Sequence, residues 1–199
     1  MAGGRYDAAR QSILVRRAHG APPLGLRGLR RWAWGELRIG VRDVAQWPDA
    51  TLGAVWPQGL DALTLLGAAR GVQARIFYHP GSPHPREAIC RELGRALLSL
   101  PPLAESPPGG FTLLAGDPDA LDFAACLLVH PGDLATALDA GQGLDGYCRA
   151  HGVSLALVSR RLALLGEWCD RAGAGLAAEV LDAVERSDWR TVRALASGE

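Results

Sequence analysis

Helix patterns fill the second half of this chain, whereas the candidate strands all lie in the first half. From Pro131 to about Ala196 the apolar residues recur at helical spacing, with short connections between segments. Alternating or β-rich runs that predict strands come earlier, at residues 37–41, 51–56 and 72–79. Strands followed by helices favour an α+β fold over a plan in which strands and helices alternate.

Four further segments have helix signals. They are residues 7–18, residues 58–71 with Gly71 as the C′ residue, Pro85 to about Leu100, and a segment opened by Asp117-Pro118. Proline and glycine predict a linker at 22–25 and a loop at 101–110. We therefore expect three parts: 1–57 with short strands, 58–140 as a central domain, and 141–199 as helices.

Positive charge is concentrated at the start of the chain. Residues 1–42 contain nine arginines but only Asp7 and Glu36, although the whole chain has a net charge of zero. Such a basic arm can dock on an acidic partner, on nucleic acid or on the protein's own acidic face. Lysine is absent, which is typical of codon bias in a GC-rich bacterial genome. The arginine content is therefore weak evidence for nucleic-acid binding.

The chain has the features of a cytoplasmic protein. Its four cysteines are Cys90, Cys126, Cys148 and Cys169, and no two of them form a CxxC pair. This pattern is typical of buried thiols in a reducing compartment. No apolar run approaches the roughly 20 residues that span a bilayer. The N-terminus has no signal-like apolar core followed by a cleavage site.

The predicted helix 86-REAICRELGRALLSL-100 has the spacing of a zinc-protease helix without its ligands. In HExxH, two histidines one turn apart bind zinc, and the glutamate polarises the zinc-bound water. Here Arg91 and Arg95 occupy the histidine positions, and Glu92 occupies that of the base. A guanidinium offers no lone pair to a metal, so zinc binding of this kind is excluded. Taken alone, this spacing of glutamates and arginines is also typical of ordinary ion pairs on a helix surface, here Glu87–Arg91 and Glu92–Arg95.

Two downstream segments give this helix a context. The stretches 119-DALDFAACLLVHPGDL-134 and 147-YCRAHGVSLALVSRRLALLG-166 resemble conserved segments of the ImmA/IrrE family of zinc-dependent peptidases, and they follow the arginine-containing helix in the family's order. The resemblance covers about residues 58–167 and implies a zincin-like domain followed by a helical, helix-turn-helix-like segment. It implies that Arg91 and Arg95 replace the zinc-binding histidines, that Glu92 is a vestigial general base, and that Asp119, or else Asp122, is the former acidic ligand.

We therefore expect a peptidase-like scaffold without a metal or another cofactor. An arginine of the altered helix, Arg95 or Arg91, is expected to pair with Asp119 or Asp122 and so join the helices that zinc would join. The remaining candidate metal ligands lack a recognised ligand spacing, and they are His79, His84, Cys90 and His130.

The segment 147–166 also has helix-turn-helix spacing. A small residue, a turn glycine and a buried aliphatic residue fall at Cys148, Gly152 and Val158. Ser154 is expected to cap the second helix, and the residues placed to contact DNA are Ser154, Ser159, Arg160 and Arg161. Nearby acidic residues argue against DNA binding, because neutralising phosphates supplies much of DNA affinity.

Three functions follow as expectations. The resemblance implies a catalytically inactive regulatory protein that binds a helix-turn-helix repressor or a related peptidase, in a stress or mobile-element circuit. One alternative is a DNA-binding regulator that uses residues 147–166 and the basic arm. The other is a metal-independent hydrolase in which Glu92 acts with Asp119, although two neighbouring arginines would keep both carboxylates ionised.

Overall fold

The computed structural model has an α+β fold and divides into two compact units. It describes residues 4–46, 56, 60–69, 72–99, 112–113, 118–173, 175–186 and 188–197. Residues 22–120 form one unit, here the sheet unit, and residues 1–21 with 121–199 form the other, here the helical unit. These units divide the chain at other places than the three segments expected from the sequence.

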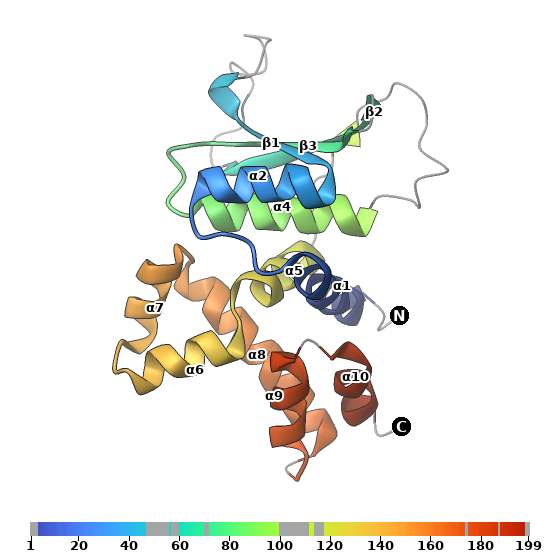
Figure 1. Cartoon of the computed structure of the whole chain (residues 1–199), viewed down its shortest axis with the longest axis vertical. Coiled ribbons are helices and arrows are strands. Elements are labelled where there is room, and N and C mark those ends of the chain that lie inside the picture. The colour runs from blue at the N-terminus through green and yellow to red at the C-terminus, as the bar shows by residue number, and fades with distance from the viewer. Residues whose placement is uncertain are drawn as a thin grey trace. The chain divides into compact units, whose positions relative to one another are not determined.

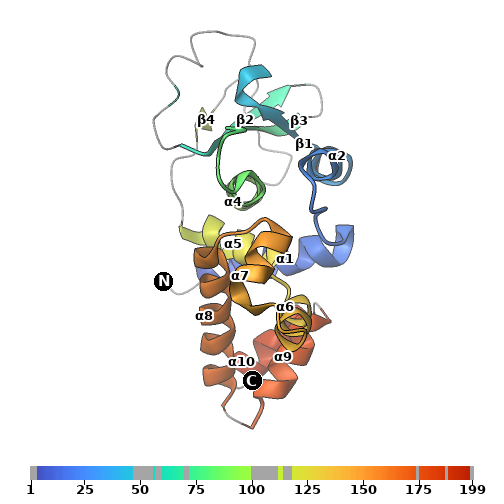
Figure 2. The ribbon, with the colours of Figure 1, turned by 90° about the vertical axis from the view of Figure 1, so that its left-hand side faces the viewer.

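The sheet unit contains four strands in the order β1-β3-β2-β4 (Figure 1). They are β1 (Ile39–Asp43), β2 (Ala62–Ala69), β3 (Val72–Tyr78) and β4 (Thr112–Leu113). Strand β1 is parallel to β3, and β2 is antiparallel to both β3 and β4. A 3-10 turn, η1 (Val44–Gln46), follows β1. Helices α2 (Leu26–Leu37) and α4 (Pro85–Ser99) lie along the same face of the sheet (Figure 2).

Strand β2 corrects the helix predicted over residues 58–71. It is a central strand with neighbours on both sides, and Ala62, Leu63 and Thr64 are buried in succession. Residues buried in unbroken succession do not show the alternation of a half-buried strand, so periodicity cannot separate them from a buried helix. The strand predicted over 72–79 is confirmed as β3. The strand predicted near 51–56 lies outside the described residues, apart from Trp56.

Helix α2 was not predicted from the sequence. Its buried residues Leu29, Ala33 and Leu37 recur every four positions and form the face that packs on β1. The helix ends at Arg38, which has a left-handed backbone with φ of 56°. Leu37 therefore belongs to the helix, and the strand predicted from this residue begins at Ile39.

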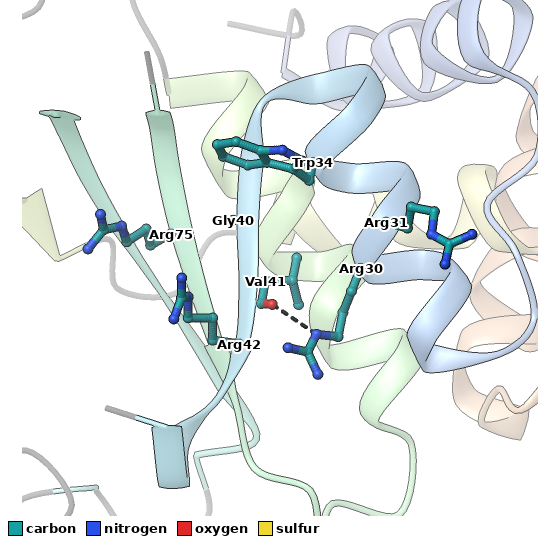
Figure 3. A pocket seen from close by; sticks show the side chains of 7 residues that line it. All are labelled: Arg30, Arg31, Trp34, Gly40, Val41, Arg42 and Arg75. Carbon is teal, nitrogen blue, oxygen red and sulfur yellow. Dashed lines mark hydrogen bonds between the residues drawn. The ribbon is translucent and has the colours of Figure 1, made fainter. Parts of the chain in front are cut away.

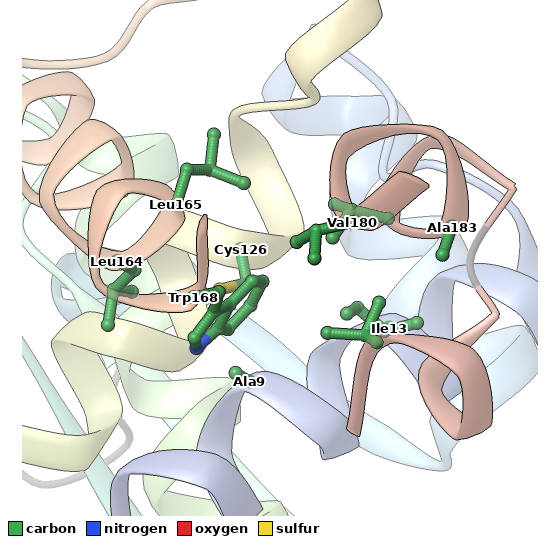
Figure 4. Packing of buried hydrophobic residues seen from close by; sticks show 10 residues of the cluster. Ala9, Ile13, Cys126, Leu164, Leu165, Trp168, Val180 and Ala183 are labelled. Atoms are coloured by element: carbon green, nitrogen blue, oxygen red, sulfur yellow. The ribbon is translucent and has the colours of Figure 1, made fainter. Parts of the chain in front are cut away.

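Seven helices of the helical unit are described. They are α1 (Gly4–His19), α5 (Pro118–Leu128, in this unit from Leu121), α6 (Pro131–Asp139), α7 (Gly143–His151), α8 (Leu155–Ala172), α9 (Ala177–Glu185) and α10 (Trp189–Ser197). Figure 4 shows their core, in which Trp168 of α8 packs with Cys126 of α5 and Val180 of α9. The predicted helices over 7–18 and from Pro118 are confirmed.

Helix α1 belongs to the helical core. Its residues Ala9 and Ile13 lie one turn apart and are buried in the same cluster as Trp168. Arg16 Nη1 donates to the Leu127 carbonyl at 3.1 Å. The first part of the expected basic arm is therefore a packed helix.

Among the described residues, no single helix is long and apolar enough to cross a membrane. The helix pair Asp119–Leu128 and Pro131–Asp139 reaches the length and apolar composition of a membrane span only when both helices are taken together, and it is bent by 55°. All four cysteines are free thiols. Cys90 and Cys126 are buried, as expected, whereas Cys148 and Cys169 are only half-buried.

Candidate functional site: helix α4 and the acidic residues of α5

Helix α4 carries the arginine-containing motif and packs on the sheet. It begins at Pro85, and Glu87 lies in its first turn, where a carboxylate is favoured by the helix dipole. Its fully buried residues Ile89, Leu93 and Ala96 have helical spacing, and the helix contacts β2 and β3. The sequence therefore predicts this element correctly from Pro85 onward.

Glu92 is a buried group that joins α4 to the sheet. The residue is only 2% exposed. The Thr64 hydroxyl, on β2, donates to Glu92 Oε2 at 2.6 Å, and the Arg95 guanidinium forms an ion pair with Oε1. Burial raises the pKa of Glu92, whereas the hydrogen bond from Thr64 and the charges of Arg95 and Arg91 act in the opposite direction. Both carboxylate oxygens therefore have partners inside the sheet unit.

The two arginines of α4 pair with glutamates of their own helix. Arg95 pairs with Glu92 at i,i+3, and Arg91 Nη1 lies 4.0 Å from Glu87 Oε1 at i,i+4. These are the two pairs that helical spacing predicts. The pairs are not ordinary surface ion pairs, because the glutamate of each pair, Glu92 or Glu87, is buried.

Asp122 has a partner other than the one predicted. Arg160, on α8, donates to both its carboxylate oxygens, from Nε at 2.5 Å and from Nη2 at 2.8 Å. Asp122 is only 2% exposed, and this hydrogen bond raises the pKa of Arg160. The predicted pairing of Asp122 with Arg91 or Arg95 is therefore wrong. Asp119, in the first turn of α5, is half-buried.

The described residues contain no group of three or more histidine, cysteine, aspartate or glutamate side chains placed to hold a metal ion. His79 Nδ1 accepts a hydrogen bond from the Gly81 backbone at 3.1 Å, and His130 Nε2 lies 3.2 Å from the Glu185 carbonyl. Burial raises the pKa of Cys90 to about 12, which disfavours the thiolate that binds metals.

Helices α7 and α8 are joined by the tight turn predicted from the sequence. Gly152 follows α7 with φ of 61° and ψ of 40°, and Ser154 Oγ accepts from the Leu157 backbone N–H at 3.1 Å. Val158 is fully buried. Cys148 is half-buried, and its carbonyl accepts from the Gly152 backbone.

The residues predicted to contact DNA lie in different environments. Ser159 is exposed, and Ser154 is half-buried and caps α8. Arg160 is paired with Asp122. Arg161 is 1% exposed, lies over the Trp168 ring, and donates from Nε to the Val129 carbonyl at 3.2 Å. Arg161 is therefore a core residue that cannot reach a phosphate in this arrangement.

The outward face of α8 is apolar and uncharged. The exposed positions between the N-cap and Glu167 carry only aliphatic, small or hydroxyl residues, and they are Leu155, Ala156, Ser159, Leu162, Ala163 and Gly166. We call these six positions the α8 face. Leu155 and Leu162 are 48% and 41% exposed. The sequence analysis did not predict this face. Its signal is that α8 has apolar residues on both sides, so that one apolar side remains exposed when the other packs in the core.

No protein-family model, curated protein or solved structure matches this chain.

Proposed function

We propose that this protein has a zincin-like scaffold that lost its metal site and now binds a regulatory protein without hydrolysing it. The observation that carries this proposal is the state of Glu92. Its carboxylate is buried and is bonded to Thr64 and Arg95. A general base has to reach a water molecule and its substrate, whereas this group is occupied in holding α4 to the sheet.

The arrangement of Asp122 supports the same proposal. In a peptidase of the resembling family an acidic residue of this segment would bind zinc. Here Asp122 accepts two hydrogen bonds from Arg160 and is buried. A bidentate arginine–carboxylate pair fixes the relative geometry of two helices, so α5 and α8 are joined without a metal.

The α8 face favours a protein partner over DNA. Its six positions offer no cation to a phosphate, and Arg160 and Arg161 are engaged elsewhere. DNA affinity depends strongly on contacts between cations and phosphates. An uncharged face with two exposed leucines has instead the composition of a site for an apolar helix of another protein. The partner class, a helix-turn-helix repressor or a related peptidase, rests on the family resemblance.

A binding experiment with matched variants tests this proposal. The immobilised protein is incubated with purified helix-turn-helix repressors and ImmA/IrrE-type peptidases from the same cell, and bound chains are weighed by mass spectrometry. We expect one of them to bind and to remain intact. We expect binding to be lost in Leu155→Glu and Leu162→Glu, because each places a charge on the α8 face.

Leu181→Glu provides the control, since Leu181 is 40% exposed on α9 and lies in the same unit. This variant should bind as the wild type does. Cleavage of the bound chain would contradict the loss of catalysis. Equal binding by all three variants would show that the α8 face is not the contact surface.

A further inference from the structure

A basic pocket lies beside β1 in the sheet unit. Figure 3 shows that its floor is formed by Gly40 and Val41 of β1. Arg42 and Arg75 line it from the strands, and α2 contributes three residues, which are Arg30, Arg31 and Trp34. Its volume is about 570 Å³.

Most of the positive charge in this pocket is not neutralised by the described part of the protein. Arg31, Arg42 and Arg75 are exposed and make no ion pair or hydrogen bond with any described residue. None of the described residues that line the pocket is acidic. Four guanidinium groups around one depression repel one another, and a bound anion would remove this repulsion.

Arg30 has a different role from the other three arginines. Its Nε donates to the Val41 carbonyl at 3.1 Å, and its Nη2 lies 3.4 Å from Gln46 Oε1. Strand β1 is at the edge of the sheet, where an unpaired carbonyl invites the addition of another strand. Arg30 blocks that carbonyl, so the pocket is better suited to a small anion than to an extended peptide.

Trp34 adds an aromatic surface to this cationic site. The residue is 46% exposed, and its ring lies over Gly40 in Figure 3. An exposed indole stacks on flat rings, and base–aromatic stacking contributes about 1–3 kcal/mol.

We propose that this pocket binds a free nucleotide carrying two or more phosphates. The phosphates contact Arg42 and Arg75, since guanidinium groups bind phosphate oxygens in a bidentate manner, and the base stacks on Trp34. The pocket's volume lies within the range of small-molecule sites. This inference is independent of the proposed function, because it uses none of the residues of the α8 face.

Calorimetric titration of the full-length protein tests the proposal. The probes are ADP, ATP, GDP and GTP, with pyrophosphate as the phosphate part alone, adenosine as the ring alone and a ten-nucleotide oligothymidylate as a strand. We expect the nucleotides to bind more tightly than pyrophosphate or adenosine. Arg42→Gln and Arg75→Gln should each weaken nucleotide binding about tenfold, the effect of losing one charged hydrogen bond. Arg27→Gln removes an exposed charge of α2 that does not line the pocket, and should leave affinity nearly unchanged.

Two further variants separate stacking and shape from charge. Trp34→Leu should weaken nucleotide binding about fivefold or more and leave pyrophosphate binding unchanged. A Cβ at Gly40 would meet only Arg75 Cγ at 3.7 Å and the Ala74 carbonyl at 3.9 Å. Gly40→Ala therefore adds a methyl group in ordinary van der Waals contact, and should weaken nucleotide binding while the melting temperature is kept.

Three results would overturn the proposal. One is the absence of nucleotide binding to the wild type. A second is binding of the oligonucleotide without the free nucleotides, which would assign the surface to a strand. The third is equal weakening in Arg27→Gln and Arg42→Gln, which would show attraction by overall charge.

Discussion

The Arg160–Asp122 pair predicts that the two single substitutions have unequal costs. Arg160→Met removes the guanidinium and keeps the length of the side chain, while Asp122→Asn removes the carboxylate charge and keeps its shape. The two side chains differ in burial, because that of Asp122 is 2% exposed and that of Arg160 is 24% exposed. The carboxylate therefore depends on its partner more than the guanidinium does.

The expected magnitudes follow from this difference. Arg160→Met leaves a buried carboxylate without its charged partner, which should lower the free energy of unfolding by about 3–5 kcal/mol. Asp122→Asn leaves a guanidinium that can reach water and keep an amide partner, so the loss should be about 1–2 kcal/mol. In the double variant the losses should not add, and a coupling energy of about 1–3 kcal/mol is expected for residues in direct contact.

Urea unfolding followed by the helical circular dichroism signal measures all four proteins of this cycle, and comparison requires an unchanged denaturant dependence. Asp122→Asn costing as much as Arg160→Met, or a coupling energy near zero, would refute the reasoning. The carboxylate would then be hydrated or paired elsewhere, and α5 and α8 would not be joined as described.

Three other substitutions test the site. Burial raises the pKa of Glu92 in the folded state, so its contribution to stability should be complete below the ordinary glutamate pKa near 4.5 and be lost as pH rises through the raised pKa. The difference in unfolding free energy between wild type and Glu92→Gln, measured by urea unfolding from pH 4 to 8, should therefore fall across that interval. A constant difference would contradict the raised pKa of Glu92. Ser154→Ala should cost about 1 kcal/mol in the same unfolding assay, because the α8 N-cap is lost, and no loss would mean that water replaces the cap. Arg161→Met should cost about 1–3 kcal/mol by leaving the Val129 carbonyl unpaired, and a neutral result would show that Arg161 is not part of the core.

Local sequence signals predicted the elements with caps and clear periodicity. Pro85 and Pro118 begin helices α4 and α5, and Gly152 with Ser154 forms the turn before α8. These signals depend on the backbone of the residue itself, so one sequence suffices to detect them. The i,i+4 and i,i+3 ion pairs of α4 were predictable for the same reason.

Features that depend on distant neighbours were missed. The helix predicted over 58–71 is strand β2, because its buried residues do not alternate and its pairing partners β3 and β4 cannot be read from the segment itself. The basic first segment was expected to dock on an acidic partner, on nucleic acid or on the protein's own acidic face, and the sequence did not decide between them. Helix α1 packs among helices more than one hundred residues away, and Arg16 lies 3.6 Å from Asp133. The partner of Asp122 was wrong because Arg160 reaches it from α8, 38 residues along the chain. No local pattern encodes that pairing.

We propose that Glu92, buried and bonded to Thr64 and Arg95, has a structural role at the position where a peptidase of the resembling family holds its metal. Zinc content measures this directly: the protein is dialysed against one equivalent of zinc, freed of unbound metal and measured by plasma mass spectrometry beside Glu92→Gln and Asp119→Asn. We expect the wild type to retain no more zinc than the two variants. One zinc per wild-type chain, lost in either variant, would contradict the account.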